Sequence, residues 1–137
     1  MVTGIRVRAG IVAEMLRHAR SEPRIECCGL LAGRDEGITA IFPAKNALAS
    51  ATAYEIAPQE LFQIFRRLRS EGLDLMGIYH SHPAGENAPS PRDIEQACYP
   101  HEAYFIILPD PGAPRAVRAF FIRDGHVEEL EIEIVAQ

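Results

Sequence analysis

The chain has 137 residues, of which 47% are hydrophobic and 24% charged, and these values are typical of one globular domain. A net charge of −5 without a long basic stripe argues against a nucleic-acid-binding protein. No apolar run approaches the length of a membrane span, and the start, MVTGIRVRAG, lacks the apolar core of a signal peptide. We therefore expect a single domain over residues 1–137 that is cytoplasmic and binds neither nucleic acid nor membrane.

The residue pattern in the first half of the chain predicts two helices separated by a pair of strands. A strand end and a first helix fall within residues 6–20, where apolar residues recur at helical spacing. The apolar strand 27–32 and the strand 38–42 flank a turn at residues 33–37. A second amphipathic helix spans residues 58–72, with a proline at its start and a glycine at its end.

The second half alternates strands and turns around one short helix. After the apolar strand 73–80 and a loop rich in Pro, Gly and Asn, a third helix begins at Ser90 and carries Cys98 as a buried thiol. A tight hairpin turn is expected at Asp124-Gly125. The remaining strands are predicted at residues 104–108, 117–123 and 129–134. Strands outnumber helices, so we expect an α/β fold with a single mixed sheet packed by helices.

Residues 80–93, HSHPAGENAPSPRD, gather two imidazoles, a hydroxyl and a carboxylate where the strand gives way to the loop and the helix. Residues two apart on a strand point the same way, so His80 and His82 can converge on one ion. Asp93 lies in the first helical turn and faces the strand end once the loop turns the chain back. This ligand set suits zinc, and three protein ligands leave one position open for water, as in catalytic sites.

The end of this segment also has a plainer interpretation. Ser90-x-x-Asp93 before a helix is a capping box, in which the serine caps the helix and the acidic residue bonds back to it. Capping and metal ligation are compatible, because a cap fixes where the first helical turn lies.

The pattern HSHP at residues 80–83, followed by Ser90-x-x-Asp93, resembles the JAMM motif of the MPN-plus metallopeptidases. The upstream glutamate of that family is matched by Glu26, at the head of ECCGLL, and the resemblance covers nearly the whole chain. It implies the MPN fold, which is cytidine-deaminase-like. It also implies the site roles: zinc ligands His80, His82 and Asp93, general acid/base Glu26, and Ser90 as the hydroxyl that steadies the tetrahedral intermediate.

Glu26 also suits this role on physical grounds. It heads an apolar strand, where a charge is costly unless it is paired or used, and a zinc hydrolase needs a base. The plainer interpretation is an ordinary carboxylate at a strand end in solvent. The other candidate for the base is Glu86, but it lies in a flexible loop, which cannot hold a catalytic group in a precise position.

The resemblance implies a zinc-dependent metallopeptidase or isopeptidase that hydrolyses the bond at the C-terminus of a ubiquitin-like or sulfur-carrier protein. In this mechanism the glutamate assists the attack of a zinc-bound water. The partner is then the C-terminal tail of that protein, and the small, polar segment 46–55 is either one wall of its groove or a plain loop.

Two alternatives from other functional classes remain. One is a non-catalytic MPN scaffold for protein–protein interaction, although such members usually lack part of the ligand set. The other is a small-molecule zinc hydrolase such as a deaminase, although the deaminase signature, His-x-Glu with Pro-Cys-x-x-Cys, is absent.

Overall fold

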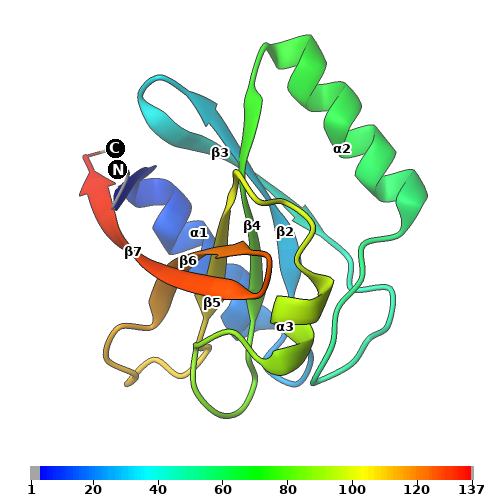
Figure 1. Ribbon diagram of the computed structural model, residues 1–137, viewed down its shortest axis with the longest axis vertical. Coiled ribbons are helices and arrows are strands. Elements are labelled where there is room, and N and C mark those ends of the chain that lie inside the picture. The colour runs from blue at the N-terminus through cyan, green and yellow to red at the C-terminus, as the bar shows by residue number, and fades with distance from the viewer. Residues whose placement is uncertain (1–3, 137) are drawn as a thin grey trace.

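One mixed sheet organises residues 4–136, the part of the chain that this computed structural model describes (Figure 1). In chain order, the elements of this part are β1 (Gly4–Arg8), α1 (Ala9–Ser21), β2 (Cys28–Arg34), β3 (Gly37–Ala44), α2 (Pro58–Glu71), β4 (Asp74–Ser81), α3 (Pro91–Gln96), β5 (Ala103–Ile107), β6 (Val117–Arg123) and β7 (His126–Val135). The predicted strands and helices are therefore present, with their ends displaced by up to three residues.

The strands pair in the order β1-β3-β2-β4-β5-β6-β7, and β1 also pairs with β7, so the sheet closes into a barrel. The pairs that involve β1 and the pair β4–β5 are parallel, and the others are antiparallel. The predicted α/β fold with one mixed sheet is confirmed. Closure was not predicted, because it depends on pairing between the two ends of the chain, which no local pattern reveals.

Two apolar cores lie on the two faces of the central strands. Leu31 and Tyr79 pack with α1, whereas their chain neighbours Leu30 and Ile78 pack with α2. Successive side chains of a strand point to opposite faces, so β2 and β4 are buried on both sides and read as continuous apolar runs. None of the helices described between residues 4 and 136 is long and apolar enough to cross a membrane.

The antiparallel register of β2 and β4 decides where the catalytic candidates lie. Cys28 is paired with His80, so continuing the register by two residues places Glu26 opposite His82. Cys27 and Ser81 lie between these two pairs and are joined twice: the Cys27 backbone N–H donates to Ser81 Oγ (2.9 Å), and the Ser81 N–H donates to the Cys27 carbonyl (3.0 Å). The sheet therefore holds Glu26 and His82 opposite each other, although they are distant in the sequence.

The placement of Cys98 differs from the prediction. Helix α3 ends at Gln96, and Cys98 lies beyond it as an exposed thiol. Two features end the helix early: Tyr99 precedes a proline, which disfavours helical geometry, and the backbone N–H groups of Cys98 and Tyr99 donate to the Tyr104 hydroxyl (3.0 Å each). The prediction of a buried thiol on the third helix was therefore wrong.

Candidate metal centre

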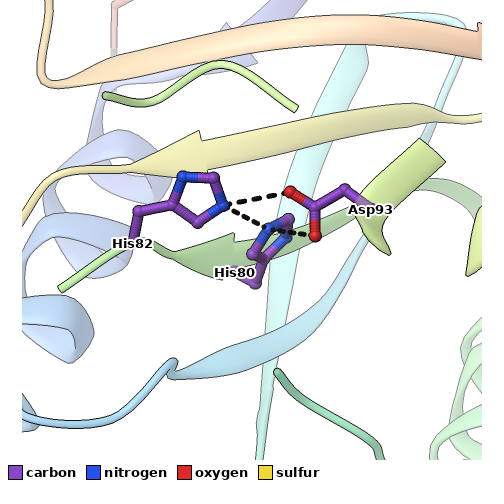
Figure 2. A group of neighbouring side chains, drawn as sticks. All are labelled: His80, His82 and Asp93. Carbon is purple, nitrogen blue, oxygen red and sulfur yellow. Dashed lines mark hydrogen bonds and ion pairs between the residues drawn. The ribbon is translucent and has the colours of Figure 1, made fainter. Parts of the chain in front are cut away.

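His80, His82 and Asp93 meet where β4 ends and α3 begins (Figure 2). The Nε2 atom of His80 lies 3.2 Å from that of His82 and 3.2 Å from Asp93 Oδ1. The Nε2 atom of His82 lies 3.0 Å from Asp93 Oδ2. The strand and the helix thus direct two nitrogens and a carboxylate to one point, as the period of a strand and the turn of the loop predict.

The cluster fits a zinc ion. Two ligands bound to tetrahedral zinc at roughly 2.0–2.1 Å lie about 3.3 Å from each other, close to the spacings between these atoms. Two nitrogens and one carboxylate oxygen are ligand types that zinc prefers. The side chains are nearly enclosed, with exposures of 1% for His80, 9% for His82 and 8% for Asp93. A cation would match the single negative charge that two neutral imidazoles and one carboxylate carry.

The ring of His82 is oriented by a backbone carbonyl. Its Nδ1 donates to the carbonyl oxygen of Glu86 at 2.7 Å, and a carbonyl can only accept, so Nδ1 carries the proton. Nε2 is then the atom directed to the cluster, which is the arrangement that metal-binding histidines use. The Glu86 side chain, the rival base, is on an exposed residue, so this residue contributes through its backbone.

The ring of His80 is held by packing instead. Its Nδ1 is buried and has no hydrogen-bond partner among residues 4–136. The ring of Tyr54 stacks on it, with 4.6 Å between ring centroids and 23° between ring planes. Burial lowers the pKa of His80, although the hydrogen bond from its ring to Asp93 opposes this. The neutral form is favoured, and this is the form that binds metals.

The carboxylate of Asp93 is anchored by the predicted capping box. The Ser90 N–H donates to Asp93 Oδ2 (2.9 Å), and the Asp93 N–H donates to Ser90 Oγ (3.1 Å). The same Oδ2 atom contacts His82, so capping and cluster formation use one carboxylate. Burial works to raise the pKa of Asp93, but hydrogen bonds from His80 and His82 hold it well below its usual range.

The hydrogen bonds of His82 also favour its charged form. Burial works to lower the pKa of His82, but its hydrogen bonds to Asp93 and to the Glu86 carbonyl outweigh burial and raise it. Without a cation, the Nε2 atom must itself carry a proton to bond Asp93. A bound cation would replace that proton, so metal binding at this cluster would release a proton and would be favoured as pH rises.

Glu26 is 4% exposed, and its Oε1 atom has no hydrogen-bond partner among the described residues. Burial raises the pKa of Glu26 to about 7, while the charge of His82 opposes the rise. A buried carboxylate with an unused oxygen and a pKa near neutrality is suited to accept and release a proton. The interpretation of Glu26 as a solvent-exposed strand-end carboxylate is therefore wrong.

A pocket of about 210 Å³ adjoins the cluster. It is mostly apolar, and His80 and Asp93 form part of its wall. Residues 53–55, at the end of the segment 46–55, and the following Ile56 also line it. Its other lining residues include Leu30, Leu61, Ile78 and Tyr104. The pocket is therefore a site where an apolar part of a substrate can lie next to the cluster.

Two contributors to the site were not identified from the sequence. Tyr54 lies in the small, polar segment 46–55, where a single aromatic residue is the only local signal. The Glu86 carbonyl has no sequence signal, because every residue offers a carbonyl. Both contacts depend on how loops fold over the strand ends.

Comparison with known proteins gives an independent view of the chain. Residues 8–123 match the family model described as prokaryotic homologs of the JAB domain. The chain is 38% identical to the probable TtuB-protein conjugate cleaving protease of Thermus thermophilus over 127 residues, which are 92% of this chain and 81% of that protein. It is 32% identical to the CysO-cysteine peptidase of Mycobacterium tuberculosis over 133 residues, which are 96% of this chain and 91% of that protein.

A solved structure agrees with the fold. The JAB1/MPN domain protein AF2198 from Archaeoglobus fulgidus aligns with a TM-score of 0.65 over 97% of this chain and 98% of that one. The sequence identity is 19%, so this likeness concerns the fold alone. The predicted MPN fold is confirmed.

Proposed function

The chain belongs to the family of prokaryotic homologues of the JAB domain, and on that premise we propose that it is a zinc-dependent metallopeptidase. The observation that carries the proposal is the buried carboxylate of Glu26, which the strand register, continued from the pair Cys28–His80, places opposite His82. In this proposal His80, His82 and Asp93 hold the zinc, Glu26 is the general acid/base, and Ser90 donates to the oxyanion.

Zinc, when bound, supplies a Lewis acid that lowers the pKa of water and stabilises negative charge on a carbonyl oxygen. Glu26 takes a proton from the attacking water and gives it to the departing amine, and a pKa of about 7 suits both transfers. Ser90 Oγ accepts from the Asp93 N–H, which leaves the hydroxyl hydrogen available to donate to the developing oxyanion. The Glu86 carbonyl keeps His82 in the correct tautomer throughout.

The proposed substrate is a ubiquitin-like or sulfur-carrier protein joined through its C-terminus to an amino acid or another protein. The names of the two relatives support this, because one is named a probable protease that cleaves TtuB–protein conjugates and the other a CysO-cysteine peptidase. The tail would reach the cluster past residues 53–56, which line the pocket. We also propose that the chain acts as one domain, since β1 and β7 pair, and that it works in the cytoplasm, where free cysteines remain reduced.

The decisive experiment incubates the zinc-loaded protein with candidate ubiquitin-like fusions and measures the products by intact mass spectrometry. Cleavage at the end of the ubiquitin-like protein is expected from the wild type, and none from Glu26→Gln at matched zinc content. A protein that binds the fusion and leaves it intact would be the scaffold alternative. Cleavage by Glu26→Gln at the wild-type rate would remove Glu26 from the mechanism.

The metal assignment has its own test. Purified His82→Ala should retain the fold and contain far less zinc than the wild type, because one of three ligands is lost. Metal analysis by mass spectrometry, with thermal unfolding to check the fold, measures this. Equal zinc content in both proteins would show that the ion is bound elsewhere.

A further inference from the structure

Asn46 follows β3 and is 3% exposed, and its amide joins three backbone carbonyls. The Nδ2 atom donates to the carbonyl oxygens of Glu26 and Ala53, both at 2.9 Å, and lies 3.4 Å from that of Ser50. Carbonyls only accept, so only the NH₂ side of the amide can face them, and the orientation of the side chain is determined by its partners.

The other half of the same amide closes the segment 46–55 on itself. Asn46 Oδ1 accepts from the backbone N–H groups of Leu48 (3.0 Å) and Glu55 (3.2 Å). The Ala47 N–H also donates to the Glu55 carbonyl (2.8 Å). The two ends of this segment thus meet around one buried side chain, and the loop has a defined shape.

Glu26 is attached to this loop through both of its backbone polar groups. Its N–H donates to the Ser50 carbonyl (2.8 Å), and its carbonyl accepts from Asn46. No side chain of the described residues bonds Glu26 Oε1, so its carboxylate is directed mainly by the backbone that carries it. On the far side, Ser81 Oγ accepts from the next N–H, that of Cys27.

The loop also carries Tyr54, whose ring stacks on His80. One buried amide therefore connects the backbone of the acid/base candidate with the residue that covers a ligand of the cluster. We propose that Asn46 is a positioning residue: it fixes the Glu26 backbone and the Tyr54 loop in one arrangement, so that the carboxylate meets the cluster correctly. This role rests on the proposed peptidase function.

The first test is kinetic. Zinc-loaded Asn46→Ala should retain its zinc and its KM for a cleavable fusion, while kcat falls about 10–100-fold, because misplacement of a catalytic group by about 1 Å costs on this order. The control is Leu130→Ala, a buried substitution on β7 that touches none of these contacts and tests the effect of lost stability. It should leave kcat per folded molecule unchanged. If Asn46→Ala does not fold, Asn46→Ser replaces it.

The second test needs no activity. Hydrogen exchange of the metal-free proteins should show the amides of Glu26, Leu48 and Glu55 exchanging at least about tenfold faster in Asn46→Ala than in the wild type. The His82 amide, which donates to the Ile107 carbonyl (2.9 Å), should be unchanged. Wild-type exchange at Glu26, or wild-type kcat in the folded variant, overturns the proposal. If the wild type cleaves no substrate, the peptidase function fails, and exchange alone then decides whether Asn46 anchors Glu26.

Discussion

The candidate site has a strand half and a helix half, and the two are held very differently. His80, His82 and Glu26 are carried by the end of β4 and the residues before β2, where the sheet register, backbone hydrogen bonds and two apolar cores restrain them. Asp93 lies on α3, a helix of six residues that contributes no fully buried residue to either core, and Ser90 caps the start of this helix. The strand half is thus determined by the fold. The helix half depends on one capping box, on the contacts of Asp93 with the two imidazoles, and on the partly buried Ile94, which packs against the core beneath α2.

Proton transfer, the step that needs the most accurate placement of a side chain, therefore falls to Glu26 in the strand half. A proton is transferred only over a short distance, so the carboxylate that accepts it must be held in place by a rigid backbone. A helix that depends on its cap and its ligands can instead be completed when a metal binds. Substitutions in each half, a change of pH and removal of the metal therefore affect the two halves differently.

Glu26→Gln should lower kcat by about 10²–10⁴, the usual contribution of a general acid–base group, with zinc content and fold preserved. The substitution keeps the shape of the side chain and removes only the proton acceptor. Turnover of a cleavable fusion and metal analysis on the same preparation measure this. The matched control is Glu86→Gln, the rival carboxylate in the loop, which should retain activity; the opposite pattern would move the base to the loop.

Ser90→Ala tests the helix half. Loss of the cap should cost about 1 kcal/mol of stability, because the Asp93 N–H loses its partner. If the hydroxyl also donates to the oxyanion, kcat should fall by about 10²–10³ as well. We expect both effects, measured by thermal unfolding and turnover. A loss of stability with unchanged kcat would leave Ser90 with the capping role alone.

The raised pKa of Glu26 predicts a pH-dependent stability of the metal-free protein. The folded state favours the neutral carboxyl of Glu26. Its contribution to the free energy of unfolding is therefore complete below about pH 4.5 and is lost as pH rises through about 7. The loss amounts to at most about 3 kcal/mol. Denaturant unfolding of wild type and Glu26→Gln across this range checks it, since the stability of the variant relative to wild type should increase with pH. A constant difference would mean that Glu26 titrates normally.

Removal of the metal should affect the two halves unequally. The amides of Asp93 and Ile94 bond Ser90 in the first turn of α3, and we expect them to exchange about tenfold faster after chelation of zinc. The amides of Ser81 and His82, which bond neighbouring strands, should change much less. Hydrogen exchange followed by NMR distinguishes these groups. Equal changes in both would show that the halves form one cooperative unit.

Local patterns in the sequence determined the parts of the site that lie close together along the chain. The alternation of a strand places His80 and His82 on one side, and the sequence Ser90-x-x-Asp93 defines the cap of α3. Both rules act over two or three residues, so they hold without knowledge of the rest of the fold.

The resemblance of the sequence to the JAMM motif pointed to Glu26, but only the tertiary structure decided how distant residues reach these ligands. Glu26 faces His82 because β2 and β4 pair in one register, and a shift of one residue would turn its side chain to the other face. Tyr54 and Asn46 reach the site because a loop folds back over the strand ends, and the sheet closes because β1 meets β7. These contacts join segments far apart in the chain, and their formation depends on the packing of the whole core rather than on local preference.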